Sequence, residues 1–406
     1  YSDTTGYYLT SNLDVHSEIG MAQTNLALAT ESSTPNEECF SELVSNGDIF
    51  FASTTSGKIW KRTSAGVYSL VHTNTQGANC GIGLWQGYLY YWSSTKLGRI
   101  TEAFASSQAS WSSQVDTFGT FTTNTSYHPM AVVGSGLYIG DGFYVDLVDS
   151  TGTFILSALD IPTVNTVSAL GATSDDIMVG TIIGTNIAWC MVYVWNRISP
   201  SYTWFDRVPE TGVNCFLKMD NVDAMQCGTS GRIYSWSGQR AVRMAKAKGV
   251  TTTVNPYNST EYQGRTLIAM GSKIFSFYRE NSSFPYALVG EYTAPGTIKS
   301  IIATINGVYV SANNVISNIG ITYANATLTT YEADGQFKDV WVRYKTLTGS
   351  IGIETSVDGG SFTAQTPIVD TVRKMVRFNG GLGYTNTLQA RITLNGYVLI
   401  KSIELM

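Results

Sequence analysis

The sequence predicts an all-β protein, a seven-bladed β-propeller followed by a small, jelly-roll-like C-terminal β-sandwich. The first observation behind this prediction is composition, because only 14% of the 406 residues are charged while 12% are aromatic. Aromatic and β-branched residues favour the half-buried surface of a sheet, whereas Lys, Glu and Ala favour helices. The other two observations are a repeat of about forty residues and a change of pattern near residue 334. They divide the chain into residues 1–37 (a strand and linker), 38–334 (the propeller) and 335–406 (the sandwich).

The repeated unit consists of an apolar strand, a tight polar turn, a second strand and a Gly-containing break before a third strand. The second strands are predicted to begin at Ile49, Tyr88, Leu137, Ile177, Ala224, Ile274 and Val308. Successive starts are separated by 39, 49, 40, 47, 50 and 34 residues. A unit of about forty residues is the size of a four-stranded propeller blade. The alternative is a large irregular β-sandwich in which this spacing arises by chance.

The break before the third strand supports the repeat. It has the sequence TSGKIW at residues 55–60 and TSGRIY at residues 229–234, with a weaker copy, LGRI, at residues 97–100. Two nearly identical hexapeptides four units apart are typical of an internal repeat.

The C-terminal region has a different pattern of clean strand alternation. Strands are predicted at residues 337–345, 351–357, 373–378, 388–394 and 397–405, with turns at Asp358-Gly359-Gly360 and Asn395-Gly396. Five strands in about seventy residues predict a compact sandwich. The first 37 residues contain a strand-like segment at residues 6–13, and they could close the last blade or add a strand to this sandwich.

The distribution of charged and apolar residues excludes two function classes. The net charge is −5, and the stretch Arg240, Arg243, Lys246 and Lys248 is not interleaved with aromatic residues, so we expect no nucleic-acid partner. No apolar run approaches the length of a membrane span, so we expect no membrane insertion. The chain begins at Tyr1, which could be a processed end or a fragment boundary.

Five cysteines leave at least one thiol without an intrachain partner. Cys215 and Cys227 lie symmetrically about Asn221, so a hairpin folded there would place them face to face, where they could form a disulfide. The alternative is two small buried apolar residues. The pairs Asp146/Asp149 and Asp220/Asp223 are ordinary turn composition, and there is no CxxC, so we expect neither a metal nor a cofactor.

We also expect no catalytic residues. Only His16, His72 and His128 are present, without metal-ligand or nucleophile-elbow spacing. Residues 356–363 (SVDGGSFT) resemble the SxDxGxTW Asp box of sialidases but depart from it at the last two positions. We interpret this segment as a hairpin turn in which Asp358 caps loop amides.

Aromatic side chains in polar, loop-like segments are the candidate ligand contacts. Trp111 lies within SSQASWSSQ, and Tyr202 and Trp204 lie within SPSYTWFDR. Flat aromatic faces can stack on sugar rings, although local packing is the alternative role for each.

The C-terminal pattern resembles a known family. Residues 337–362 (FKDVWVRYKTLTGSIGIETSVDGGSF), 388–405 (LQARITLNGYVLIKSIEL) and 4–15 (TTGYYLTSNLDV) are similar to a sandwich module found beside propeller or repeat regions in virion proteins of tailed bacteriophages. The resemblance implies a structural or host-contacting tail, fibre or decoration protein and carries over no catalytic residue.

From this resemblance we expect a non-enzymatic protein of the virion or another extracellular location. Its expected partners are other virion proteins and a host surface glycan, within a larger or homo-oligomeric assembly. The blades match no particular propeller family. The alternatives are a secreted glycan-binding or glycan-cleaving propeller and a bacterial surface adhesin.

Overall fold

The computed structural model describes residues 9–14, 22–43, 47–101, 115–126, 128–173, 175–184, 187–217, 219, 224–236, 240–279, 286–305, 307–330, 332–334, 337, 339–379 and 387–405. All regular structure in these ranges is β, which confirms the all-β prediction. None of the described segments forms a helix with the length and apolarity needed to cross a membrane. The chain divides into two compact units, unit 1 (Tyr1–Ala29, Lys273–Ala294 and Ile319–Met406) and unit 2 (Thr30–Ser272 and Pro295–Asn318). The predicted domain boundaries stay predictions.

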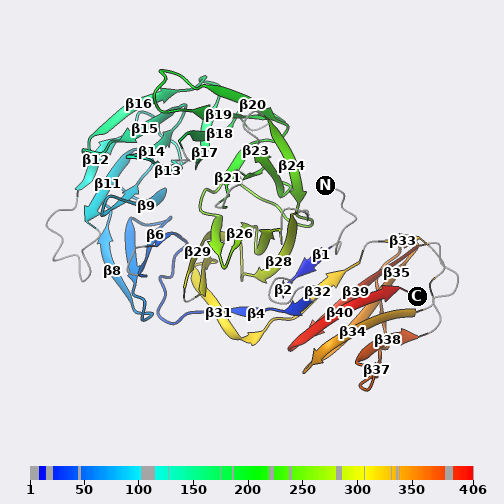
Figure 1. Cartoon of the computed structure of the whole chain (residues 1–406). Helices are drawn as coiled ribbons and strands as arrows, with labels where there is room; N and C mark the ends of the chain where they lie inside the picture. The colour runs from blue at the N-terminus through cyan, green and yellow to red at the C-terminus, as the bar shows by residue number, and fades with distance from the viewer. Residues whose placement is uncertain are drawn as a thin grey trace. The chain divides into compact units, whose positions relative to one another are not determined.

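Seven four-stranded sheets follow one another along the chain, here numbered sheets 1 to 7 (Figure 1). Sheet 1 contains β5 (Cys39–Leu43), β6 (Ile49–Ser53), β7 (Lys58–Arg62) and β8 (Tyr68–Thr73). Sheet 2 contains β9 (Gly81–Trp85), β10 (Tyr88–Trp92), β11 (Lys96–Thr101) and β12 (Val115–Thr120). Sheet 3 contains β13 (Met130–Val133), β14 (Gly136–Asp141), β15 (Tyr144–Val148) and β16 (Phe154–Asp160).

The remaining four-stranded sheets continue this order. Sheet 4 contains β17 (Thr166–Ala172), β18 (Ile177–Ile182), β19 (Cys190–Trp195) and β20 (Trp204–Val208). Sheet 5 contains β21 (Val213–Phe216), β22 (Ala224–Cys227), β23 (Arg232–Trp236) and β24 (Ala241–Lys246). Sheet 6 contains β25 (Ser259–Tyr262), β26 (Arg265–Met270), β27 (Lys273–Tyr278) and β28 (Ala287–Thr293). Sheet 7 contains β29 (Ile298–Thr304), β30 (Gly307–Ala312), β31 (Val315–Tyr323) and β4 (Leu26–Thr30).

Within unit 2, apolar side chains pack several neighbouring sheets against one another. Separate buried clusters join sheets 1 and 2, 2 and 3, 3 and 4, and 4 and 5. A further cluster joins the first sheet to the last, with Phe51 of sheet 1 packing in the same cluster as Ile302 and Tyr309 of sheet 7. The inner strands β29 and β5 are also in contact. The first and last of these sheets therefore pack against each other.

Six of the seven predicted second strands occupy the second position in their sheets, and the sixth does not. The strand predicted at Ile274 is β27, the third strand of sheet 6, while the second strand is β26. The hairpin between β25 and β26 turns at Gln263 and Gly264, which both have positive φ. Counted correctly, the starts Ala224, Arg265 and Gly307 are 41 and 42 residues apart, so the irregular gaps of 50 and 34 disappear.

The TSG(K/R)I breaks precede the third strands of sheets 1 and 5, and in both sheets they carry an ion pair. Lys58 Nζ lies 2.9 Å from Glu37 Oε1, and Arg232 Nη1 lies 2.7 Å from Glu210 Oε1. Each carboxylate comes two or three residues before the first strand of its own sheet. The repeated basic residue therefore ties the entry of the sheet to its third strand.

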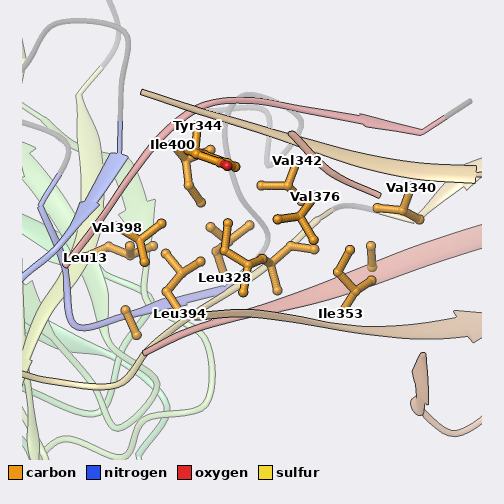
Figure 2. Packing of buried hydrophobic residues seen from close by; sticks show 14 of the residues in the cluster. Leu13, Leu328, Val340, Val342, Tyr344, Ile353, Val376, Leu394, Val398 and Ile400 are labelled. Carbon is orange, nitrogen blue, oxygen red and sulfur yellow. The ribbon is translucent and has the colours of Figure 1, made fainter. Parts of the chain in front are cut away.

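Unit 1 contains two six-stranded sheets. One contains β1 (Leu9–Ser11), β32 (Ala326–Thr329), β33 (Ala333–Asp334), β35 (Ser350–Val357), β36 (Thr363–Gln365) and β39 (Thr387–Asn395). The other contains β2 (Leu13–Asp14), β3 (Ala22–Thr24), β34 (Asp339–Leu347), β37 (Ile368–Asp370), β38 (Met375–Asn379) and β40 (Val398–Leu405). Figure 2 shows side chains of both sheets, such as Leu328 and Leu394 of the first and Val342 and Ile400 of the second, in one apolar layer.

Both roles left open for the N-terminal segment are present. β1 pairs with β32 and β3 pairs with β40, so this segment extends both sheets of unit 1, while β4 is the fourth strand of sheet 7. The turn at Asn395-Gly396 connects β39 to β40, which belong to different sheets. The turn at Asp358 does form a hairpin, between β35 and β36, and the Asp358 carboxylate accepts a hydrogen bond of 2.9 Å from the Thr387 amide on β39.

The predicted face-to-face register of Cys215 and Cys227 is wrong. Cys215 lies opposite Gln226, and a β-bulge before it places Cys227 opposite Val213. Both thiols are free and buried, so the disulfide that this register would allow is absent. The predicted turn residue Asn221 lies outside the described residues.

Candidate ligand-binding surface on sheet 4

The structure places two of the three predicted ligand contacts on sheet 4. Trp204 is the first residue of β20 and is 44% exposed, and Tyr202 lies two residues before it. The sequence placed both in a loop, whereas Trp204 already pairs with Val194. Trp111 lies outside the described residues.

The turn that leads into β20 is fixed by its own polar groups. Asn196 Oδ1 accepts hydrogen bonds from the amides of Ile198 and Ser199, and Trp195 Nε1 donates to the Ser199 carbonyl over 2.8 Å. The amide of Thr203 then donates to the Val194 carbonyl and starts the strand pairing. These contacts fix the backbone conformation of the turn that precedes Trp204 and Phe205.

β20 is the edge strand of sheet 4. As in any β-strand, its successive side chains point to opposite faces of the sheet. On one face, Val208 packs in a buried cluster with residues of sheet 5. Trp204 and Asp206 belong to this face by alternation, and Asp206 Oδ2 accepts a hydrogen bond of 2.8 Å from the Ala241 amide on β24. Trp204 therefore lies on the face turned toward sheet 5.

Three aromatic rings meet on the other face. The ring centroids of Tyr202 and Phe205 are 5.9 Å apart in an edge-to-face arrangement, and both rings lie within 6.2 Å of Tyr193. Tyr193 is buried, and its hydroxyl accepts a hydrogen bond from Asn165 Nδ2, while Phe205 is 53% exposed. Burial raises the pKa of Tyr193 to about 12, so its hydroxyl stays neutral. Phe205 therefore presents an open ring that a buried tyrosine supports from behind.

The same face continues to Trp189 and Arg207. The guanidinium carbon of Arg207 lies 4.2 Å from the centre of the Trp189 ring. Trp189, Tyr202, Phe205 and Arg207 are here called the aromatic strip. Trp189, Phe205 and Arg207 were not among the predicted ligand contacts, although the alternation within WFDRV (residues 204–208) indicates that Phe205 and Arg207 share a face.

The two described histidines are held by internal networks. His72 Nε2 lies 2.7 Å from Asp116 Oδ1, and the hydroxyl of Tyr91 donates to the same oxygen over 2.5 Å. Burial alone would raise the pKa of Asp116, but hydrogen bonds from His72, Thr75 and Tyr91 outweigh it and hold this pKa well below its usual range. This network joins β8 of sheet 1 to β10 and β12 of sheet 2.

His128 is buried, and its two ring nitrogens lie 2.8 and 3.1 Å from the carbonyl oxygens of Gly140 and Ser94. His16 lies outside the described part of the chain. Within the described residues, no three His, Cys, Asp or Glu side chains are grouped so that they could hold a metal ion. Asp149 instead accepts hydrogen bonds from the amides of Thr151 and Thr153 in its own turn.

Comparison with known proteins identifies the fold only. No family model and no curated protein matches the chain. Solved structures that resemble it include a streptogramin B lyase (TM-score 0.53, 9% identity, covering 75% of this chain and 97% of that one). The Cps50 (Swd1) β-propeller domain of Myceliophteria thermophila has a TM-score of 0.52 at 10% identity and covers 73% of this chain and 100% of that one. The Pan2 WD40 domain of Neurospora crassa has a TM-score of 0.50 at 10% identity and covers 74% and 96%. These similarities support a β-propeller.

Proposed function

We propose that this chain is a non-enzymatic recognition or structural component of a phage-like virion, a tail, fibre or decoration protein whose propeller is a rigid binding and assembly surface. We also propose the finer architecture: sheets 1 to 7 are the seven blades of one closed propeller, and the two six-stranded sheets form a C-terminal β-sandwich that the N-terminal strands complete. The expected location is the virion or another extracellular site.

The observation that carries the recognition role is the exposed aromatic surface of β20, which consists of the aromatic strip on one face and Trp204 on the other. Phe205 and Trp204 are exposed on opposite faces of an edge strand, at a site where a purely structural sheet has no need of large aromatic side chains. Tyr193 and the turn at Asn196 fix the backbone and rings beneath them. A rigid aromatic surface loses little conformational entropy on binding, which suits recognition of a ligand such as a glycan.

The virion assignment has a separate support. The family resemblance covers residues 4–15 together with the C-terminal seventy residues, and strands from both segments share two sheets and one core in unit 1. The segments are joined through two strands that lie outside both of them: β1 pairs with β32, which pairs with β39, and β2 pairs with β3, which pairs with β40. A module that needs both segments is consistent with the resemblance.

A second candidate is a secreted glycan-binding or glycan-cleaving propeller, or a bacterial surface adhesin. The aromatic strip favours glycan binding equally in these settings. One structural neighbour is a streptogramin B lyase. A turnover assay is therefore the direct test of the proposed non-enzymatic role.

Two experiments test the proposal. Peptide mass spectrometry and antibody labelling of purified particles should find the chain on a virion, and its absence there would overturn the virion assignment. A glycan array followed by turnover assays should show binding without product, since hydrolysis or elimination would identify an enzyme instead.

The binding surface is tested by substitution. Trp204→Ala and Phe205→Ala should each weaken binding to the host surface at least about fivefold, because aromatic contacts contribute about 1 kcal/mol or more. The matched control is Leu156→Ala, an exposed apolar side chain (48% exposed) on β16, the equivalent strand of sheet 3. Equal binding by all three variants would remove sheet 4 as the site.

A further inference from the structure

The guanidinium of Arg207 is an exposed charge that no carboxylate of the described residues neutralises. Arg62, Arg232, Arg343 and Arg391 all form ion pairs with glutamates, and none of the ion pairs between described residues includes Arg207. The adjacent Asp206 side chain turns to the opposite face of β20, where the Ala241 amide binds it. Arg207 therefore lacks the carboxylate partner that these four arginines have.

The contact with Trp189 occupies only one part of the guanidinium. The guanidinium carbon lies over the indole ring, 4.2 Å from its centre, in a cation–π contact that uses none of the N–H donors for an ion pair. Its N–H donors point outward in the plane of the group and suit the two oxygens of a carboxylate. Stacking on Trp189 also limits the rotamers of Arg207, so less entropy is lost when a ligand binds.

The surroundings of Arg207 add a second requirement on the ligand. Arg207 and Phe205 are two residues apart on one strand and share a face, so an exposed ring lies next to the cation. Phe205 and Tyr202 offer apolar area and no charge. A ligand that fits both features carries a carboxylate beside a ring with an apolar C–H face.

We propose that the aromatic strip binds an acidic glycan, with a sugar carboxylate on Arg207 and the sugar ring stacked on Phe205. This inference rests on the proposed recognition function and adds the class of ligand. The net charge of −5 does not oppose it, because charges more than about 10 Å apart are largely screened at physiological salt. Uronic acids and sialic acids share the required chemistry.

The test uses matched pairs of probes that differ in the carboxylate. Binding is measured by calorimetry for an oligogalacturonate and its methyl ester, and for sialyllactose and lactose. The wild-type chain should bind at least one acidic member at least about tenfold more tightly than its neutral counterpart, because a charge-assisted hydrogen-bond pair is lost in the neutral sugar. Raising the salt concentration should reduce this preference.

Substitutions then assign the preference to Arg207. Arg207→Gln should abolish the preference and leave binding of the neutral sugar unchanged, whereas Arg207→Lys should retain part of it, since lysine keeps the charge but not the planar fork. The control is Arg243→Gln, an exposed arginine on β24, the equivalent strand of sheet 5, which should change nothing. Unchanged melting temperatures would show that each variant is folded.

The outcomes separate this inference from the proposed function. Binding of neutral sugars with no acidic preference, or a preference that survives Arg207→Gln, would overturn the inference and leave the recognition function standing. Binding of none of the four probes at millimolar concentration would overturn the inference as well, and detection of the chain on virions would then decide the proposed function separately.

Discussion

The hydroxyl of Tyr257 hydrogen-bonds both backbone groups of Ile82, accepting from its amide over 2.7 Å and donating to its carbonyl over 2.8 Å. Tyr257 belongs to the segment between sheets 5 and 6, and Ile82 lies on β9, the inner strand of sheet 2. The ring centroid of the same tyrosine lies 4.5 Å from that of Phe40 of sheet 1 in a tilted arrangement, and its backbone carbonyl accepts a hydrogen bond from the amide of Ile301 on sheet 7. One residue therefore connects the inner strands of three sheets in unit 2, two through its side chain and the third through its backbone carbonyl.

Tyr257→Phe should destabilise the protein by about 1–3 kcal/mol, because it leaves a backbone donor and acceptor of an inner strand without partners. Denaturant unfolding measures this change, and amide exchange at Ile82 should accelerate. Tyr262→Phe, at the end of β25, is the control, because its hydroxyl contacts only the exposed side chain of Gln263 among the hydrogen bonds seen. A Tyr257→Phe variant as stable as the control would show that this contact does not hold the sheets together.

Glu31→Gln should weaken the connection between β4, the N-terminal strand of sheet 7, and sheet 1. Glu31 follows β4 directly and accepts hydrogen bonds from Arg62 Nε and Nη2 and from the Tyr68 hydroxyl. We expect a loss of about 1–3 kcal/mol, since these bonds involve charged, half-buried groups. Glu354→Gln, which disturbs the more exposed pair with Arg391, should cost less than about 1 kcal/mol.

The Glu31 carboxylate also makes the free energy of unfolding depend on pH. Burial alone would raise the pKa of Glu31, but the hydrogen bonds from Arg62 and Tyr68 outweigh it and hold this pKa below its usual value. The stabilisation is therefore present above about pH 4.5 and is lost as the pH falls through the lowered pKa. Glu31→Gln should flatten this part of the acid-unfolding curve, and an unchanged curve would contradict the assignment.

Asp146→Asn should stabilise the protein more at pH 8 than at pH 5. Asp146 is fully buried on β15, and burial raises its pKa to about 7, from a usual value of 3.8. The folded chain then holds an extra proton between about pH 4 and 7, so the free energy of unfolding falls as the pH rises through this window. We expect Asn to recover on the order of 1–3 kcal/mol at pH 8 relative to pH 5.

The physical cause of this penalty is visible in the hydrogen bonds of Asp146. Oδ1 accepts from the Ser157 amide over 2.8 Å, in a β-bulge where Ser157 has positive φ, while Oδ2 has no hydrogen-bond partner among the described residues. Asp160→Asn, at an exposed position of β16, is the control. If both variants show the same difference between the two pH values, Asp146 is not the titrating group.

Cys80 should be the only cysteine that reacts rapidly with a thiol reagent in the native protein. It is partly exposed, whereas Cys39, Cys190, Cys215 and Cys227 are buried, and burial raises the pKa of Cys190 and of Cys215 to about 12. Alkylation and peptide mapping should show Cys80 modified first and all five after unfolding. A crosslinked peptide joining Cys215 to Cys227 would contradict the free thiols.

Much of the fold was predictable because it depends on local chemistry. Turn residues and alternating apolar residues predicted six of the seven second strands, and the TSG(K/R)I repeats correctly marked the third strands of sheets 1 and 5. The error at Ile274 arose because the Gly271-Ser272-Lys273 turn resembles the turns that precede second strands elsewhere. The hairpin at Gln263 and Gly264, which sets the register of sheet 6, was overlooked.

The candidate site was only partly predictable. Trp204 and Tyr202 were recognised as aromatic residues in a polar segment, but only Tyr202 belongs to the aromatic strip. The strip also needs Trp189, which precedes β19, and a register that places Arg207 over its ring. That register depends on which residues of β19 and β20 pair, and a shift of one residue would turn Phe205 and Arg207 to the other face. The register predicted for Cys215 and Cys227 was wrong for the same reason, because a β-bulge shifts the pairing of the two strands.

The sequence by itself determined that this chain is all-β, repeats about every forty residues and changes pattern near its C-terminus, because alternation and turn chemistry are local properties. Only the tertiary structure decided that the N-terminal strands complete three sheets and that Tyr257 reaches Ile82. It also decided that Asp146 is buried, and that Arg207 lies beside an open aromatic ring. These facts depend on contacts between residues far apart in the chain, and no local pattern encodes such contacts.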